Sequence, residues 1–313
     1  MLRPLAISLC LTAPAAEAQD IGARLQEAWR GWVEEGGTEV ATLAVLHDGE
    51  LVVEEGLGAG ADAALPLASL SKPLTAACAL ALPELTAQTK VGSLLGGKGT
   101  AAEAELGALL THSAGIWPDA TQGNAAIVLS EEPMTGEVAR VALARAEQEG
   151  EPGSYAYNNE NYALVGAMIE AATGESYAEA CDAALMAPLG LQSAALTGPW
   201  VGQGPWGGWQ MSAADYARFV EATFGPEGSV DPASAPMLDL GDGFATLGGA
   251  LSRELEGRRL YWGFGQLCWD GRGDGSYFAS YGNGWVVVVL HNDCPPDERL
   301  AALDAALFEA AHP

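Results

Sequence analysis

The sequence predicts an α+β fold, in which one antiparallel sheet is built from the N- and C-terminal segments and is flanked by helices. β-rich patterns occur in residues 40–53 and again from about residue 244 onward, while the long middle is typical of helices and loops. We find neither internal repeats nor a linker between independent domains. Residues 19–313 are therefore expected to form a single domain, with a sheet part at about 19–68 and 240–313 and a mainly helical part at about 69–239.

The N-terminus is typical of an export signal. Arg3 is followed by an apolar stretch, residues 4–15, and Ala16-Glu17-Ala18 fits the small-x-small rule of signal peptidases. Residues 1–18 are thus predicted to be a signal peptide, and the mature chain is expected to start at Gln19 in a secreted or periplasmic protein. No later stretch reaches about 18 uninterrupted apolar residues, so no membrane anchor is expected.

A helix and a hairpin follow the predicted signal. Apolar residues at helical spacing from Ile21 to Val33 predict a helix, which Gly36-Gly37 ends. Residues 40–46 and 51–53 are β-rich, and Asp48-Gly49 between them is a strong two-residue turn signal. The sequence therefore predicts a β-hairpin here.

The helical middle is predicted from apolar spacing and capping signals. Ser176 with Glu179 forms a capping box, and Ser212 with Asp215 caps a later helix. Helices are expected, in chain order, at residues 69–82, within 100–150, at 161–172, after Ser176 and after Ser212.

The C-terminal segment returns to β structure. Strands are expected near residues 247–251, at 260–268, near 277–281 and at 285–290. Pro295-Pro296 then opens a final amphipathic helix that runs to Ala311.

Four cysteines remain after the predicted signal is removed, at positions 78, 181, 268 and 294. An oxidising compartment permits disulfides, and four cysteines allow three pairings. Cys268 and Cys294 are the favoured pair, because both belong to what read as neighbouring strands. Four buried thiols are an equally good alternative, since a chain of this length can build a core without covalent links.

The charge balance is strongly acidic, with 14 Lys and Arg against 41 Asp and Glu and a net charge of -27. This balance argues against a broad basic face for nucleic acid or anionic lipid. The acidic residues are scattered, which is typical of a solvated surface. No cluster has zinc-ligand spacing, so neither a metal nor a cofactor is expected. The expected partner is a small-molecule or peptide-like substrate, and the protein is expected to be a monomer.

Ser69-Leu70-Ser71-Lys72 places a hydroxyl and an amine three residues apart. On a helix these positions share a face, so Ser69 Oγ and the Lys72 amine can meet. The serine stands at the predicted helix start, where free N–H groups favour a developing negative charge. A desolvated lysine there can lose its proton and activate the serine. The alternative is a helix-capping serine beside an exposed lysine.

Tyr157-x-Asn159 lies in a turn-rich loop, residues 152–159, just before the helix predicted at 161–172. It sets a phenol and an amide on one side of an extended loop. A phenol near a lysine ammonium is expected to have a lowered pKa and to pass protons to and from Ser69. Taken alone, the pair is better explained by a buried aromatic residue in a loop.

Taken together, these segments resemble the penicillin-recognising serine hydrolases: class C-type β-lactamases, DD-peptidases and related esterases. The resemblance covers most of the mature chain, and its five matches occur in the family's order. The matches are residues 45–52 with the family's first hairpin, 68–76 with its nucleophile helix, 109–116 with its L-L-T-H-x-S-G loop, Tyr157-x-Asn159 with its second motif, and 207–215 with a segment before a later helix.

The resemblance implies roles for these residues. Ser69 is expected to be the acyl-accepting nucleophile, and Lys72 its base or the base's partner. Tyr157 is expected to relay protons, and Asn159 to hold Lys72 or the substrate amide. The oxyanion hole would combine the Ser69 N–H with an N–H from a strand. The histidine equivalent to His112 is usually structural in this family, so His112 is not taken as catalytic.

The family's third motif, Lys-Thr-Gly or His-x-Gly on the strand facing the nucleophile, has the weakest match. The candidate is residues 269–275, where Trp269 replaces the cation. Gly271 would let a substrate lie against the strand, and the Arg272 N–H would be the second oxyanion donor. A Gly-rich loop with a solvated Arg272 explains this stretch equally well.

The sequence therefore predicts an exported serine hydrolase that forms an acyl-enzyme on Ser69 with an amide or an ester. A DD-peptidase or esterase of the same family and a catalytically silent ligand-binding or sensor domain are the alternatives. Only Arg272 is available in the third-motif candidate to hold a substrate carboxylate. Uncharged esters or amides are accordingly expected to be better substrates than β-lactams.

Overall fold

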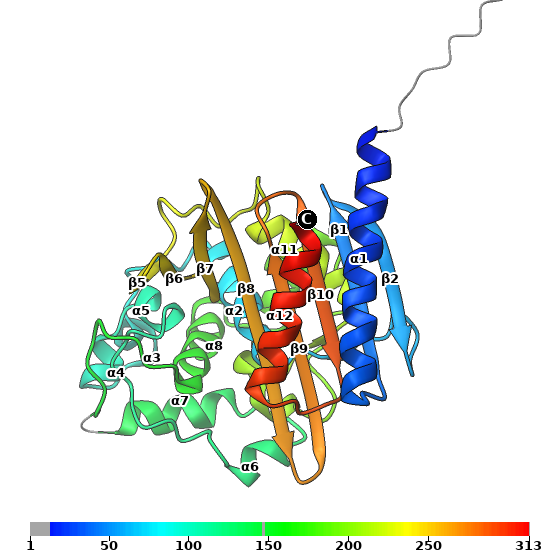
Figure 1. Cartoon of the computed structure of the whole chain (residues 1–313). Coiled ribbons are helices and arrows are strands. Elements are labelled where there is room, and N and C mark those ends of the chain that lie inside the picture. Colours follow the sequence, from blue (N-terminus) through cyan, green and yellow to red (C-terminus); the bar gives the residue numbers. More distant parts are fainter. Residues whose placement is uncertain (1–12, 146–147, 313) are drawn as a thin grey trace, which may run out of the picture.

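The computed structural model describes residues 13–145 and 148–312, and an eight-stranded sheet forms its centre. The strand order is β2-β1-β10-β9-β8-β7-β6-β5, and every neighbouring pair is antiparallel. The strands are β1 (Ala41–His47), β2 (Glu50–Leu57), β5 (Met237–Gly241), β6 (Phe244–Leu247), β7 (Ala250–Leu255), β8 (Arg258–Trp269), β9 (Arg272–Ser280) and β10 (Trp285–His291). Because the N-terminal hairpin pairs with the last strand, the predicted α+β fold is confirmed (Figure 1).

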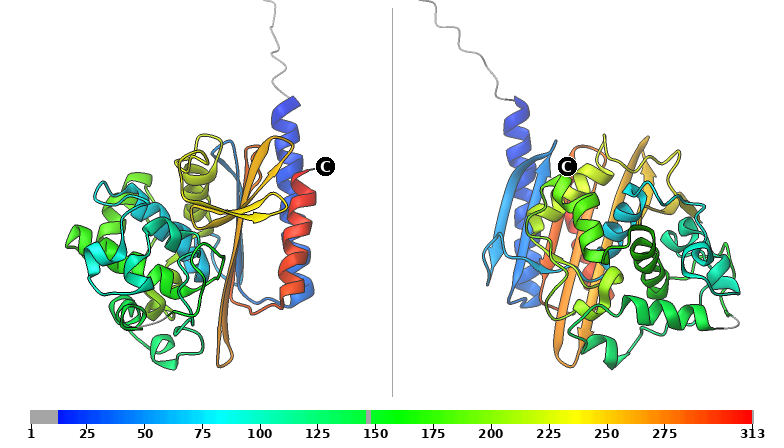
Figure 2. Two further views of the ribbon diagram at one scale, coloured as in Figure 1. Left: turned by 90° about the vertical axis from the view of Figure 1, so that its left-hand side faces the viewer. Right: turned by 180° about the vertical axis from the view of Figure 1, so that it is seen from behind.

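Helices lie on both faces of the sheet. α1 (Ala13–Gly36) and α12 (Asp297–Ala311) pack side by side on one face, and the other helices lie on the opposite side (Figure 2). These are α2 (Ser71–Ala81), α3 (Val91–Leu95), α4 (Thr100–Glu103), α5 (Leu106–Leu110), α6 (Ala125–Val128), α7 (Thr135–Ala144), α8 (Asn159–Thr173), α9 (Tyr177–Cys181), α10 (Ala187–Leu189) and α11 (Ala213–Phe224). Shorter elements are η1 (Ala68–Leu70), η2 (Asp182–Met186), η3 (Val201–Trp206) and the paired strands β3 (Leu65–Pro66) and β4 (Gln210–Met211).

Strand β10 is buried on both faces of the sheet. Val286 and Val288 contact the larger helical layer, whereas Val287 and Val289 pack with α1 and α12. Side chains alternate between the two faces along a strand, so an uninterrupted apolar run supplies both layers at once. The run from Trp285 to Leu290 therefore forms an interior strand on which both hydrophobic clusters meet.

Local signals in the sequence explain several element boundaries. Asp48 and Gly49 have φ values of 49° and 80°, as a two-residue hairpin turn of type I′ requires. The capping box of Ser176 and Glu179 is present at the start of α9. The Ser212 side chain accepts the Asp215 N–H at the start of α11, as the sequence predicted.

Other boundaries differ from the predictions. α1 begins at Ala13 and runs through the predicted cleavage site, while residues 1–12 of the predicted signal lie outside the described residues. The strand expected near 247–251 is two strands, β6 and β7, because Gly248-Gly249 turns the chain between them. Strand β5 was not predicted, and as an exposed edge strand it lacks a buried face that would impose alternation. Among the described residues, no helix combines the length and apolar character needed to cross a bilayer.

Two disulfides join the four cysteines. Cys78–Cys181 is buried and ties α2 to α9, and Cys268–Cys294 is exposed and ties β8 to the segment after β10. The favoured pairing of Cys268 with Cys294 is confirmed, and the alternative of four free thiols is wrong. The two cysteines are not on adjacent strands, because β9 lies between β8 and β10.

Loss of the buried disulfide should destabilise the fold. The variant Cys78→Ala/Cys181→Ala is expected to lower the free energy of unfolding by about 2–4 kcal/mol, because the bond restricts a long loop of the unfolded chain. Guanidinium unfolding followed by tryptophan fluorescence measures the change. Cys268→Ser/Cys294→Ser is the control, and its smaller loop should give a smaller loss. A Cys78→Ala/Cys181→Ala midpoint equal to that of the wild type would contradict this account.

Candidate active site

Ser69 stands in the 3₁₀ turn η1, directly before helix α2. The preceding residue, Ala68, is fully buried and has a φ of 47°. This left-handed conformation is unfavourable for a residue with a Cβ, and such strain is concentrated at functional sites. The sharp turn places Ser69 at the N-terminus of α2, where backbone N–H groups lack partners within the helix. Ser69 stays partly accessible.

Lys72 lies one helical turn after Ser69 and is buried, with 2% of its surface exposed. Its Nζ donates to Ser69 Oγ at 3.1 Å and to the carbonyl oxygen of Trp206 at 2.8 Å. Burial lowers the pKa of Lys72 to about 7, and the charge of Asp119 partly opposes that shift. Near pH 7 a substantial fraction of the amine is therefore neutral and able to accept the proton of Ser69.

Tyr157 completes the contacts of the nucleophile. Its hydroxyl lies 2.8 Å from Ser69 Oγ, and its ring lies 4.8 Å from Lys72 Nζ. Burial raises the pKa of Tyr157 to about 12, although 41% of the residue stays exposed at the mouth of the site. The predicted lowering of this pKa is therefore wrong, because desolvation outweighs the lowering effect of the hydrogen bond with Ser69. The phenol starts the reaction protonated and suits a proton relay better than a base.

Two buried polar residues hold the Tyr157 loop. His112 Nδ1 accepts the backbone N–H of Asn158 at 3.3 Å, and the His112 and Tyr157 rings lie 4.5 Å apart. Burial lowers the pKa of His112 to about 3, so the ring is neutral. The Asn158 amide donates to the carbonyl oxygen of Ile116, and its oxygen caps α8. These contacts agree with a structural role for His112.

Asn159 is not brought to Lys72. It is the first residue of α8, its side chain donates to Thr121 Oγ1 at 2.9 Å, and its backbone N–H donates to Asp119. The Trp206 carbonyl oxygen occupies the position beside Lys72 that Asn159 was expected to fill. The structure thus places Asn159 in the contact between the Asp119 loop and α8.

Gly271 and Arg272 are also not brought to Ser69. Asp270 and Gly271 have φ values of 47° and 79° and form the two-residue turn between β8 and β9. Together with Arg272 they line a separate cavity of about 370 Å³ beside the Cys268–Cys294 disulfide. The turn begins five residues beyond Gly265 of β8, roughly 17 Å at the usual rise of a strand. The third-motif candidate was therefore placed too late in the chain.

The strand segment that faces the nucleophile is Gly263-Phe264-Gly265 of β8. A Cβ on Gly265 would come within 2.5 Å of the Leu67 carbonyl oxygen and 2.8 Å of Ser69 N. Only glycine allows this approach. β7 pairs with β8 no further than Trp262, so beyond it β8 has no strand partner on that side. Free N–H groups of this part of β8 are candidates for the second oxyanion donor.

Ser69, Lys72 and Tyr157 share one cavity of about 190 Å³. The other lining residues are Leu70, Pro73, Leu110, His112, Tyr155, Thr246, Gly249, Ala250, Leu251, Gly263 and Phe264. Among the described residues that line it, Lys72 is the only cation. In the described part of the chain, no group of three or more His, Cys, Asp or Glu side chains could hold a metal ion.

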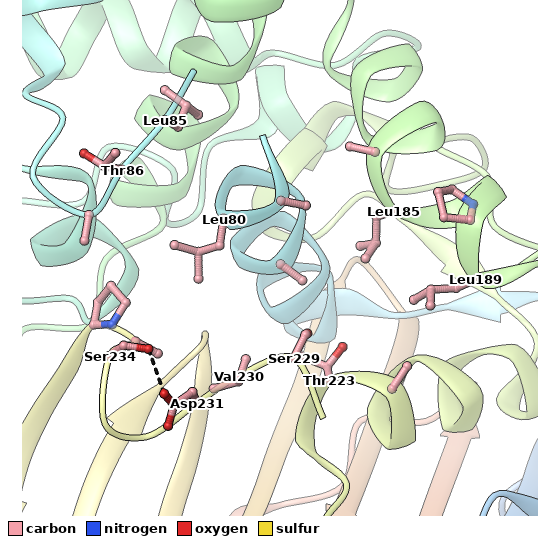
Figure 3. A pocket seen from close by; sticks show the side chains of 18 of the residues that line it. Leu80, Leu85, Thr86, Leu185, Leu189, Thr223, Ser229, Val230, Asp231 and Ser234 are labelled. Carbon is pink, nitrogen blue, oxygen red and sulfur yellow. Dashed lines mark hydrogen bonds between the residues drawn. The ribbon is translucent and has the colours of Figure 1, made fainter. Parts of the chain in front are cut away.

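A second, larger cavity of about 510 Å³ lies behind the C-terminal half of α2 (Figure 3). Its walls are mostly apolar, with Leu80, Leu185 and Leu189 among them. Ser234 donates to Asp231 there at 3.0 Å, and no lysine or histidine lines the space to activate a hydroxyl. The Ser69 cavity is therefore the candidate active site.

Comparisons with solved structures find the same fold. An octameric penicillin-binding protein homologue from Pyrococcus abyssi is 19% identical to this chain and superposes with a TM-score of 0.74. The match covers 92% of this chain and 77% of the homologue. A beta-lactamase/D-alanine carboxypeptidase from Pseudomonas syringae is 17% identical with a TM-score of 0.74, covering 94% and 99%. A D-amino acid amidase from Ochrobactrum anthropi SV3 is 17% identical with a TM-score of 0.71, covering 93% and 99%.

A comparison with curated proteins finds no match. The family model described as Beta-lactamase matches residues 23–312, which is nearly the whole chain. The match includes Ser69, Lys72 and Tyr157, the three residues that share the cavity. With this match and the shared fold, the chain belongs to the beta-lactamase family of serine hydrolases.

Proposed function

We propose that this protein hydrolyses an uncharged ester or amide through an acyl-enzyme on Ser69. The observation that carries the proposal is the position of Ser69 Oγ, which lies within hydrogen-bond distance of both Lys72 Nζ and the Tyr157 hydroxyl. One neighbour is a base with a pKa of about 7, and the other is a protonated phenol. A nucleophile between a base and an acid suits acyl transfer.

The proposed reaction balances its protons within these three side chains. Neutral Lys72 takes the Ser69 proton as Oγ attacks the substrate carbonyl carbon. The resulting oxyanion is held by the Ser69 N–H and an N–H of β8. Tyr157 gives its proton to the leaving alcohol or amine and regains one from the Lys72 ammonium. Water then attacks the acyl-enzyme, with the same groups acting in reverse, and releases the acid.

The substrate class follows from the charges around Ser69. A carboxylate substrate needs a cation near the oxyanion strand, and β8 presents Gly263-Phe264-Gly265 there. Arg272, which was expected to serve, is the first residue of β9, directly after the β8–β9 turn. The net charge of -27 also disfavours the approach of anions. The D-amino acid amidase acts, by its name, on amides of amino acids, which lack a free carboxylate, and that lack of a negative charge suits this site.

We also propose that the protein is exported. The positive, apolar and small-residue segments of residues 1–18 support this, and so do two disulfides, which form in oxidising compartments. N-terminal sequencing of the protein recovered outside the cytoplasm is expected to start at or near Gln19. A retained Met1 would count against export, because the predicted signal peptide would then not have been removed.

The proposed base predicts the pH dependence of the rate. Only neutral Lys72 accepts a proton, so kcat/KM is expected to rise with pH to a plateau above about 7, the pKa of Lys72. Stopped-flow or steady-state rates with p-nitrophenyl acetate from pH 5 to 9 measure the profile. Lys72→Arg, which stays charged, should lose about 10²–10⁴ in kcat/KM. A flat profile would exclude Lys72 as the base.

The close approach of β8 predicts an effect of one methyl group. Gly265→Ala should lower kcat by at least about 10²-fold, because the new Cβ would displace the Ser69 N–H from the oxyanion position. Gly271→Ala is the matched control. It strains a turn but meets no atom within 4 Å and should retain most activity. Equal activities of the two variants would remove β8 from the oxyanion hole.

The choice of substrate tests the proposed function itself. We expect kcat/KM for nitrocefin, a carboxylate substrate, to stay below about 10⁵ M⁻¹s⁻¹, the range of efficient enzymes, while p-nitrophenyl acetate is turned over. Arg272→Ala should change neither value, because Arg272 lies outside the site. Efficient nitrocefin hydrolysis would contradict the uncharged substrate, and turnover of neither compound nor of an amino acid amide would favour a silent binding domain.

A further inference from the structure

A further cavity, of about 230 Å³, lies on the face of the sheet opposite the Ser69 site. It is formed between α12 and strands β6 to β9. In Figure 1, α12 lies in front of the sheet near β9, and β8 and then β7 follow to its left. The proposed hydrolase does not use this cavity, because none of its lining residues lines the Ser69 site.

Aromatic side chains make up most of its wall. Phe244 and Trp262 contact each other edge to face, with ring centroids 5.9 Å apart. Tyr281 and Phe308 form a second edge-to-face pair at 6.0 Å. The four rings come from two strands, the residue after β9 and one helix, so they surround a space rather than stack in a row. Aromatic faces carry negative potential and attract cations that have shed water.

A carboxylate also lines the cavity. Asp304 of α12 is half-buried, and its Oδ1 accepts the Tyr277 hydroxyl at 2.8 Å. That bond fixes the side chain. Asp304 Oδ2 accepts no hydrogen bond from the described residues, so it is available to a ligand. A fixed carboxylate beside aromatic faces is the arrangement that recognises organic ammonium ions.

The one cation among the described lining residues is Arg253, an exposed residue of β7. Its guanidinium carbon lies 4.9 Å from the centre of the Phe244 ring. Arg253 therefore competes with a bound cation through charge repulsion. Its contact also shows that an aromatic ring of this wall already accepts a cation.

We propose that the cavity between α12 and strands β6 to β9 binds a small organic ammonium ion between the aromatic rings and Asp304. The net charge of -27 raises the local concentration of cations at the surface. The ligand class is set by two features together: the rings favour a weakly hydrated organic ion over a hydrated inorganic one, and Asp304 supplies the negative charge that attracts a cation. This site is independent of the Ser69 chemistry.

Isothermal titration calorimetry with choline tests the proposal, and the uncharged isostere 3,3-dimethylbutan-1-ol is the matched ligand. We expect choline to bind with a dissociation constant at or below about 1 mM, and the alcohol about tenfold more weakly or not at all. Ser69→Ala should bind choline as the wild type does. Absence of choline binding, equal binding of the alcohol, or loss of binding in Ser69→Ala would each overturn the proposal.

Charge variants locate the bound cation. Asp304→Asn keeps an acceptor for Tyr277 and should weaken choline binding about tenfold. Glu309→Gln, an exposed residue of the same helix, removes the same charge and should leave binding unchanged. Arg253→Gln should strengthen binding. Equal effects of Asp304→Asn and Glu309→Gln, or weaker binding in Arg253→Gln, would show that the cavity does not hold the cation.

Discussion

The burial of the Lys72 amine beside Ser69 is the condition on which the proposed chemistry depends. In water a lysine is charged at pH 7 and cannot serve as a base. Here burial lowers the pKa of Lys72 to about 7. The contacts of its Nζ with the Trp206 carbonyl oxygen and with Ser69 Oγ hold the amine beside the serine hydroxyl. The same burial keeps Tyr157 protonated. One desolvated cavity thus sets a base and an acid on either side of one hydroxyl.

The rest of the fold holds the residues of that cavity in place. Strand β8 passes against the nucleophile turn because Gly265 carries no side chain, and β10 supports the sheet with apolar contacts on both faces. Cys78–Cys181 ties α2, which begins beside Ser69, to α9. The site therefore lies where segments from the two ends of the chain and its helical middle meet, and its geometry exists only in the assembled fold.

The sequence was sufficient for features that depend on local chemistry. The i, i+3 spacing correctly predicted the contact between Ser69 and Lys72, although Ser69 lies in the turn before α2. The Asp48-Gly49 turn and the Ser176 capping box were also predicted from the sequence. Long-range contacts were not. Trp206 contacts Lys72 through its backbone carbonyl oxygen, a group that every residue type has, so the sequence could not predict this contact. Asn159 instead donates to Thr121, in a loop 38 residues earlier in the chain. Asp270-Gly271 did carry a usable signal, since that pair marks a hairpin turn.

Acylation of Ser69 is the central claim, and intact-mass spectrometry with a fluorophosphonate tests it most directly. In that reaction the serine oxygen bonds to phosphorus and fluoride leaves with the serine proton. The account predicts one adduct on the wild-type chain, no adduct on Ser69→Ala, and slower labelling of Lys72→Ala at pH 7, because the base is lost. An adduct on Ser69→Ala that forms at the wild-type rate would contradict it.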